Sequence, residues 1–529
     1  MIANKRIEQK LVSCFLNRAV AWDWVVAGVT LFLFVCFIYF MPNTTGNEDV
    51  YLINSQKIVN PNFLAHDQLM GGFRYHRVLF DVLVGPFFYF FSPLQIALLG
   101  RVFVWSLLIW ALTRLAKTLG LKWWEFVLIF SFWFYSGQAL VAGEWVFGGF
   151  ESKCLAYVFL FLSLRSILRS ELIKSAILCG VSACFHILVG GWGAVGLFMV
   201  VLISEKEYRL KKMAIYCFFV FLCSLPALAP NLLDIWINGA LTKEACRILV
   251  IFRGPHHLDP ECFMTRKALG LFVFYGFATF TIWKSFKWEH SLKLNVFLTS
   301  LMVIFVLGLL ARKINMFSFL IFYPFRLGPL FLSLFFPLGA IHYLRVYFMR
   351  KGMLTRGICL SLSFILLFIL LDKNMPRKFL GSPEGFLHAW KNYFLKRGKD
   401  DFGDMASWIK KNTARDSVFI GPPMNSKFYL FAERAQVVSF KYMPAAKIEE
   451  WYIRLVDLNG GFQFKSRGFE IHNELNKNYS ILTLKQLQDI KTKYDTQYYL
   501  TPKEREDLPF LLAYFNKSYY LYDLRKLKK

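Results

Sequence analysis

Long, nearly uncharged apolar runs constrain this chain more than any other feature. Trp24–Phe40, Phe126–Tyr135 and Phe297–Leu310 carry almost no charge, and each is long enough for a membrane span or a large part of one. Backbone groups in lipid must hydrogen-bond within their own segment, so we expect each run to be a helix. With 56% hydrophobic and only 18% charged residues, the chain is too apolar for a soluble protein.

The apolar runs predict an α-helical polytopic membrane domain over residues 1–372 with about eleven transmembrane helices. Basic residues precede the first run and no small-residue cleavage site follows it, so we expect this helix to be retained. One composite run breaks near Ser92-Pro93, and we expect it to cross once while 78–92 dips into the membrane or lies along its surface. The expected helices cover 21–41, 78–116, 123–141, 154–168, 173–188, 191–203, 213–231, 266–284, 293–311, 318–343 and 356–371.

Basic residues predict the sidedness of the loops. Lys and Arg gather in the N-terminal tail and in alternate loops, which the positive-inside rule assigns to the cytoplasm. The remaining loops and everything after Asp372 then face outward. These loops, and attraction to anionic lipid headgroups, account for the net charge of +27 without a nucleic-acid partner.

Residues 373–529 predict a small soluble α/β domain. Short strands alternate with amphipathic helices, which is typical of a two- or three-layer α/β unit. No glycine-rich phosphate loop follows any of the strands, so we expect no nucleotide site there. The expected helices cover 401–411, 447–458 and 484–494, and the expected strands cover 417–421, 436–440, 497–500 and 518–522.

The outward segments hold most of the unusual polar residues, whereas the cytoplasmic loops are short and basic. Glu48 and Asp49 follow the first span, and Glu144 lies in a glycine-rich segment over 143–153. If the topology is right, all of these segments face one compartment. We therefore expect Asp49, His256 and Arg326 to converge on one outer cavity.

Two roles suit these residues if the chemistry is sugar transfer from a lipid-phosphate carrier. Asp49 is the candidate base or metal ligand and Glu48 its assistant, against the plainer interpretation of a solvated acidic loop. Basic side chains that could hold the phosphate, together with Glu144, are the candidate substrate-binding residues. The alternative for the basic side chains is that they extend to lipid headgroups. The candidate cations are Arg74, His76, Arg77, Arg253, His256, His257 and Arg326, with Arg312 and Lys313 beside them.

Three further features stay open in the sequence. The adjacent pair His256-His257 lacks the spacing of a zinc site, although Asp49 could hold a divalent cation such as Mg²⁺ or Mn²⁺. Glu151 and Lys153 could form an internal ion pair at the start of a span. Cys246 and Cys262 share one loop, where they are either a disulfide or two free thiols.

This layout resembles the GT-C superfamily of polytopic glycosyltransferases, which use polyprenyl-phosphate sugars. Residues 144–153, 185–192, 253–260 and 408–418 are similar to an uncharacterised bacterial membrane-protein family. The resemblance implies a catalytic carboxylate at Asp49 or Glu48 and a lipid-linked sugar donor. It also implies a bacterial inner membrane, a cytoplasmic N-terminus and a periplasmic C-terminal domain. The order Glu-Asp departs from the common Asp-Asp or Asp-Glu.

Two other classes of function compete with the enzyme. A transporter or flippase for lipid-linked saccharides would show paired broken helices in two halves of the chain, and no such symmetry is visible. A non-catalytic membrane scaffold would lose all function without its C-terminal domain and would tolerate changes of the outer carboxylates.

Overall fold

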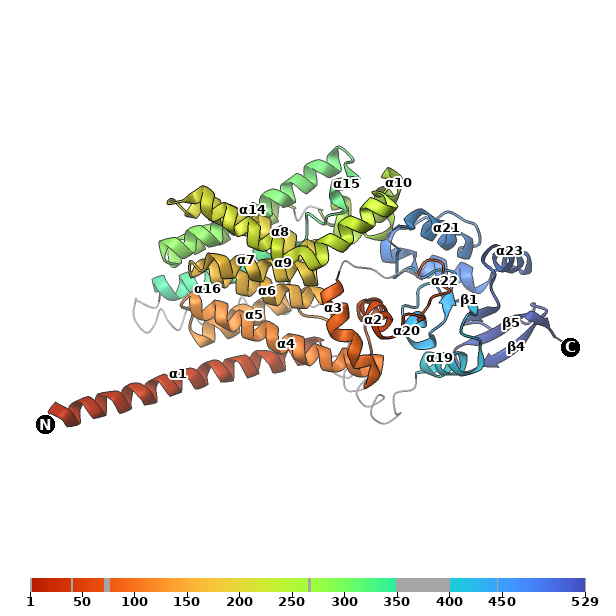
Figure 1. The fold of residues 1–529 in the computed structure, drawn as a ribbon, viewed down its shortest axis with the longest axis horizontal. Coiled ribbons are helices and arrows are strands. Elements are labelled where there is room, and N and C mark those ends of the chain that lie inside the picture. Colours follow the sequence, from red (N-terminus) through yellow and green to blue (C-terminus); the bar gives the residue numbers. More distant parts are fainter. Residues whose placement is uncertain are drawn as a thin grey trace.

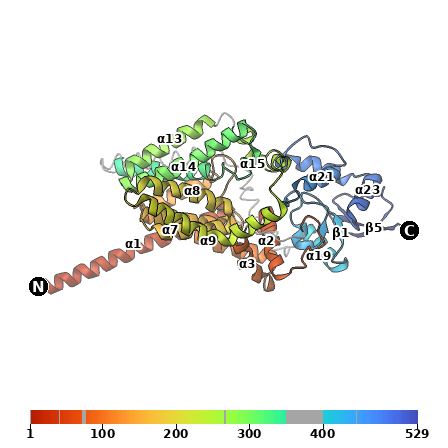
Figure 2. The ribbon, with the colours of Figure 1, turned by 45° about the horizontal axis from the view of Figure 1, so that its top comes forward.

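The computed structural model describes residues 2–39, 41–70, 77–264, 268–348, 400–444 and 446–528. A helical bundle forms the N-terminal part, and a small sheet with flanking helices forms the C-terminal part. The C-terminal part lies at the end of the bundle opposite the N-terminus in both views (Figures 1 and 2). The helix expected over 356–371 and the boundary expected at 372 lie outside the described residues.

The bundle helices lie in the apolar runs, but several ends differ from the expected ones. The helix α1 begins at Ile2 rather than 21, α9 extends to Asn238 rather than 231, and α16 begins at Leu327 rather than 318. The longest internal packing interfaces join α6 to α7, α7 to α9 and α13 to α16. The helices are α1 (Ile2–Tyr39), α2 (Gly46–Val59), α3 (Val78–Val84), η1 (Gly85–Tyr89), α4 (Pro93–Thr118), α5 (Trp123–Tyr135), α6 (Ser152–Leu168), α7 (Leu172–Phe185), α8 (Ile187–Ser204), α9 (Arg209–Asn238), α10 (Lys243–Arg247), η2 (Ile248–Arg253), α11 (Pro255–Leu258), α12 (Pro260–Phe263), α13 (Ala268–Ser285), α14 (Trp288–Lys313), α15 (Phe317–Leu320) and α16 (Leu327–Phe348).

Within the described residues, six helices are long and apolar enough to cross a membrane. They are α4, α8, α9, α14, the Ala21–Tyr39 part of α1 and the Leu327–Tyr347 part of α16. The chain is therefore a multi-pass membrane protein. The total of about eleven spans stays a prediction, because helices such as α7 are apolar but shorter than a typical span.

The composite run over 78–116 breaks at the expected place. Ser92 caps α4 by accepting a hydrogen bond from the backbone N–H of Gln95, and Pro93 occupies the first helical position, where a missing N–H costs nothing. The preceding α3 and η1 have seven and five residues. At about 1.5 Å per residue they are too short to cross about 30 Å of hydrocarbon, so α4 alone can span.

The C-terminal domain is a three-layer α/β unit around a five-stranded sheet of order β2-β1-β3-β5-β4. The first three strands in this order are parallel and the last two pairings are antiparallel. Successive residues of β1 point to opposite faces, so Phe419 packs with α19 while Ile420 packs with the helices on the other side. The elements are α19 (Asp401–Asn412), β1 (Val418–Ile420), α20 (Phe428–Ala432), β2 (Ala435–Gln436), α21 (Ile448–Leu458), η3 (Gly468–Ile471), α22 (His472–Ser480), α23 (Leu484–Tyr494), β3 (Tyr498–Thr501), β4 (Phe510–Phe515) and β5 (Tyr520–Leu527).

Two details of this domain differ from the sequence expectations. The strand expected over 436–440 is only β2, because the chain leaves the sheet after Gln436 and the Phe440 N–H bonds instead to the carbonyl oxygen of Pro423. The edge strand β4 was not predicted, and its irregular register against β5 explains the weak alternation of its sequence.

In the adjoining loop of the bundle, Cys246 and Cys262 are free thiols.

The two parts of the chain share one continuous apolar core. Phe252 of η2 inserts among aromatic side chains of the C-terminal domain, with its ring 4.8 Å from that of Tyr452 and 5.0 Å from that of Phe464. Buried Asp259 accepts from Arg312 of α14 at 2.9 Å and from Arg467 of the C-terminal domain at 2.7 Å. The C-terminal domain is thereby packed onto the 248–263 segment and the end of α14.

A fully buried ion pair fixes α2 against α4. Arg101 Nε donates to Glu48 Oε1 at 2.7 Å, and a second guanidinium nitrogen contacts Oε2. The Glu48 carboxylate also accepts from the backbone N–H groups of Thr45 and Phe150. Both partners are buried, so all of these contacts are needed to offset the loss of hydration.

We expect Arg101→Met to destabilise the protein by about 3–5 kcal/mol, because it leaves the Glu48 carboxylate buried without a counter-charge. Thermal unfolding of the detergent-solubilised full chain would measure this loss. Arg114→Met, at an exposed position of the same helix, is the matched control. Adding Glu48→Gln to Arg101→Met should restore part of the loss, and an unchanged melting temperature in Arg101→Met would contradict this account.

Candidate functional site

The first turn of α2 brings one of its three polar residues to a cavity. Asn47, Val50 and Tyr51 line a cavity of about 270 Å³, which we call the polar chamber. Their spacing of three and four residues is that of one helix face. Glu48 and Asp49 therefore point elsewhere, Glu48 to Arg101 and Asp49 to Ser426 of the C-terminal domain at 2.7 Å.

This orientation corrects one expectation. His256 and Arg326 both line the polar chamber, but Asp49 does not, so the three do not converge as the sequence suggested. The reason is the capping box of α2, in which Glu48 bonds back to the Thr45 N–H. That bond, together with the pair to Arg101, sets the rotation of the helix.

The loop between α5 and α6 supplies the carboxylates of the site. Gln138 organises this loop: its amide oxygen accepts from the N–H groups of Val146 and Phe147, and its amide nitrogen donates to the Phe147 carbonyl. The expected helix over 123–141 ends at Tyr135, because the backbone turns through positive φ at Gly137 and Gln138. Glu144 and Glu151 then project from a loop held at several points.

Glu144 and Glu151 share Lys153 as their counter-charge. The Lys153 ammonium lies 3.3 Å from Glu144 and 3.6 Å from Glu151, and it sits 3.5 Å from the centre of the Trp145 ring. The ion pair expected between Glu151 and Lys153 is thus present. Asn47 also donates to both oxygens of Glu151, at 3.2 Å each.

Arg326 completes this network from the start of α16. Its Nε lies 3.0 Å from Glu144, and its Nη1 lies 3.1 Å from Nε2 of His186, which stands between α7 and α8. The guanidinium also lies 4.4 Å from the centre of the Tyr323 ring. Residues from four separate segments of the chain therefore meet at the end of the bundle that faces the C-terminal domain.

The two histidines of the 254–260 segment line the chamber as neutral groups. Burial, with Arg253 and Lys441 nearby, lowers the pKa of His256 to about 4. Burial and the adjacent His256 hold the pKa of His257 well below its usual value. His257 Nδ1 lies 2.6 Å from the Ala142 carbonyl oxygen and must donate to it, which leaves Nε2 as an acceptor. Neither histidine is the cation that the sequence suggested.

Positive charge dominates the polar chamber. Among the residues that the structure describes, five basic side chains line it against the single carboxylate of Glu151. Arg77 is held by the Val50 carbonyl at 2.9 Å and lies 3.7 Å from Asp81. The basic residues of the lining are Arg77, Lys153, Arg253, Arg326 and Lys441.

A second, largely apolar cavity of about 660 Å³ adjoins the polar chamber, and we call it the apolar cavity. Its apolar wall comes from the ends of α1 and α5, including Ile38, Tyr39 and Phe134. Both cavities are lined by Asn47, Trp145, Glu151, His256, Lys441 and Phe469. A charged headgroup and an apolar tail could thus be held side by side.

Several residues of the site escaped the sequence analysis. Asn47 was overlooked beside its acidic neighbours, and Lys441 lies far away in a domain assigned no site. Glu151 and Lys153 were noted only as an ion pair. Of the predicted residues, Arg77, Arg253, His256, His257 and Arg326 line the polar chamber, Glu144 lines the apolar cavity, and Arg74 and His76 lie outside the described residues.

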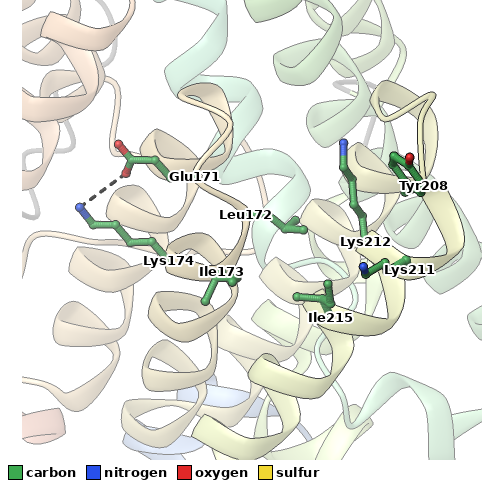
Figure 3. Close-up of a pocket in the computed structure, with 8 residues that line it drawn as sticks. All are labelled: Glu171, Leu172, Ile173, Lys174, Tyr208, Lys211, Lys212 and Ile215. Atoms are coloured by element: carbon green, nitrogen blue, oxygen red, sulfur yellow. Dashed lines mark ion pairs between the residues drawn. The ribbon is translucent and has the colours of Figure 1, made fainter.

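A cleft of about 600 Å³ lies at the other end of α7, between the first turns of α7 and α9. Glu171 and Lys174 point toward one another there, 3.5 Å apart (Figure 3). Lys212, on the other side of the cleft, pairs with Glu205 at 2.5 Å. These lysines have carboxylate partners and extend into solvent. Three lysines and one glutamate line this cleft, so cations outnumber acids here as in the polar chamber. The difference lies in burial, because Lys153 and Arg326 of the polar chamber are buried.

The described residues offer no ready metal site. Among them, no group of three or more His, Cys, Asp or Glu side chains could hold a metal ion. Asp49, the expected ligand, is bonded to Ser426 and has the Lys427 ammonium nearby. We therefore derive no step through a divalent cation.

Comparison with known protein families finds one match, in the C-terminal part of the chain. Residues 400–458 match a family described as "Domain of unknown function (DUF6798)". No curated protein matches the chain. Among solved structures, the chain is similar to the arabinofuranosyltransferase AftD from Mycobacteria, with 11% identity over 95% of this chain and a TM-score of 0.44. The chain covers 40% of the length of that protein.

We expect Asp49→Asn to stabilise the protein at neutral pH. Burial raises the pKa of Asp49 to about 6, so the folded state disfavours the carboxylate that the unfolded chain carries above about pH 4. Removing the charge should raise the free energy of unfolding by at most about 3 kcal/mol at pH 7.5, and by about half of that at pH 5. Melting temperatures of both proteins at the two pH values would test this. A gain that grows toward low pH would contradict it.

Proposed function

We propose that this chain is a membrane glycosyltransferase that takes its sugar from a polyprenyl-phosphate-linked donor. In this proposal it acts at the outer face of the bacterial inner membrane, with its N-terminus in the cytoplasm and its C-terminal domain in the periplasm. The observation that carries the proposal is the polar chamber, with five basic side chains around one carboxylate, opening beside the apolar cavity.

The pairing of the two cavities favours an amphiphilic phosphate as substrate. Arginine and lysine bind phosphate through charge-assisted hydrogen bonds, and excess positive charge in a buried site needs an anion to balance it. The apolar wall at the ends of α1 and α5 suits an isoprenoid tail at the level of the membrane. A soluble sugar nucleotide would not need this wall.

Glu151 is the carboxylate best situated to act as the base. It lines both cavities, and hydrogen bonds from Asn47 and from Trp145 Nε1, at 3.2 Å, fix its orientation. In the proposed reaction it takes the proton from an acceptor hydroxyl while that oxygen attacks the anomeric carbon of the donor. When Glu151 becomes neutral, Lys153 retains Glu144 as its partner.

The leaving group in this reaction is the lipid phosphate. The bond between the anomeric carbon and the phosphate oxygen breaks, and its electron pair stays with the phosphate. Cations around the chamber stabilise the negative charge that develops there, which is a major source of rate enhancement in enzymes. Trp145 offers an aromatic face to the sugar at the boundary between the two cavities.

We expect Glu151→Gln to lower the transfer rate by about 100-fold or more, because removal of a general base typically costs that much. The assay uses the full chain in lipid nanodiscs with a panel of synthetic polyprenyl-phosphate hexoses and pentoses. Transfer of radiolabelled sugar to water and to added saccharide acceptors is measured.

Glu171→Gln is the matched control, because the same change at the half-buried cleft of Figure 3 removes only surface ion pairs. It should transfer sugar at the wild-type rate. Full transfer by Glu151→Gln would remove Glu151 from the mechanism. Absence of transfer by the wild-type chain from every donor of the panel would contradict the proposed function itself.

A further inference from the structure

Two cations of the polar chamber come from different parts of the chain and lack carboxylate partners. Arg253 ends η2 of the bundle, and Lys441 follows the short strand β2 of the C-terminal domain. Within the described part of the chain, neither makes an ion pair, in contrast to Lys153 and Arg326 of the same chamber. Both line the chamber wall.

The backbone holds these two side chains together. Arg253 Nη2 donates to the carbonyl oxygen of Lys441 at 3.1 Å, and Arg253 Nε is buried without a hydrogen-bond partner. The faces of Phe440 and Phe469 cover the Arg253 guanidinium at 4.6 and 5.7 Å. Phe469 also lies 5.0 Å from the Lys441 ammonium. The aromatic rings support both cations without neutralising them.

This arrangement of two buried cations carries an electrostatic cost. Burial lowers the pKa of Arg253 to about 10. Burial and the charge of Arg253 lower the pKa of Lys441 to about 8, although the carboxylates of Glu151 and Asp49 oppose this shift. Two like charges held in a poorly hydrated space repel each other, and an anion between them would remove that penalty.

We infer that Arg253 and Lys441 form a clamp for one phosphate group, and that the C-terminal domain is therefore part of the substrate site. This inference rests on the proposed function and names two residues that hold the headgroup of its donor. The domain reaches the chamber because Phe252, adjacent to Arg253, and Asp259, six residues after it, both contact the C-terminal domain. Docking of the domain and assembly of the clamp are thus one event.

The test measures binding rather than transfer. Farnesyl monophosphate, inorganic phosphate and farnesol are titrated into the full chain in detergent micelles, and the melting temperature is followed. We expect saturable stabilisation by farnesyl monophosphate, weaker stabilisation by inorganic phosphate and little by farnesol. Lys441→Gln should lower the affinity for both farnesyl monophosphate and inorganic phosphate by about 10- to 100-fold, the usual effect of losing one charged hydrogen bond.

Two variants separate binding from folding. Lys441→Arg keeps the charge and should bind close to the wild-type level, and Lys485→Gln, at an exposed position of α23, should behave as the wild type. Without ligand, Lys441→Gln should melt at a higher temperature than the wild type, because it removes the repulsion from Arg253. A lower melting temperature would mark Lys441 as a structural cation and overturn the clamp.

The remaining outcomes distinguish the clamp from the proposed function. If Lys441→Gln binds farnesyl monophosphate as the wild type does, the clamp is wrong and the lipid-linked donor stands. If inorganic phosphate binds as tightly as farnesyl monophosphate, the clamp stands and the lipid-linked donor is contradicted. If neither phosphate stabilises the wild-type chain, both proposals fail.

Discussion

The buried contact between Glu48 and Arg101 sets the geometry on which the rest of the site depends. It joins the first turn of α2 to α4, and the same carboxylate holds the backbone of Phe150 at the end of the loop that carries Glu151. Gly149 makes this approach possible, since a Cβ there would come within 2.9 Å of the Glu48 side chain. A carboxylate that the sequence suggests for chemistry instead orients a helix and a loop.

Several acidic residues near the site are paired in such structural contacts and do not line the polar chamber. The chamber therefore carries an excess of positive charge. Asp259 binds Arg312 and Arg467 across the boundary between the two parts of the chain. Asp67 is buried and accepts the backbone N–H groups of Leu69, Met70 and Gln436. The net charge of the chamber lining depends on which acidic residues pair with partners elsewhere in the fold. The sequence of one loop cannot predict that pairing.

Much of the fold could be predicted because its signals are local. A run of apolar residues predicts a helix in lipid, and Ser92-Pro93 predicts the start of α4, because both depend on the chemistry of neighbouring residues. Amphipathic periodicity likewise located α19, α21 and α23. The strand β4 was missed because an irregular edge strand lacks strict alternation.

By itself, the sequence determined a multi-pass helical protein with its unusual polar residues in alternate loops and a small α/β domain at its C-terminus. Only the tertiary structure decided which of those residues share a space. The rotation of α2 turned Asn47 toward the chamber and Asp49 away from it, and packing around Phe252 brought Lys441 beside Arg253. These choices depend on contacts between residues far apart in the chain. Hydropathy and spacing carry no record of such contacts.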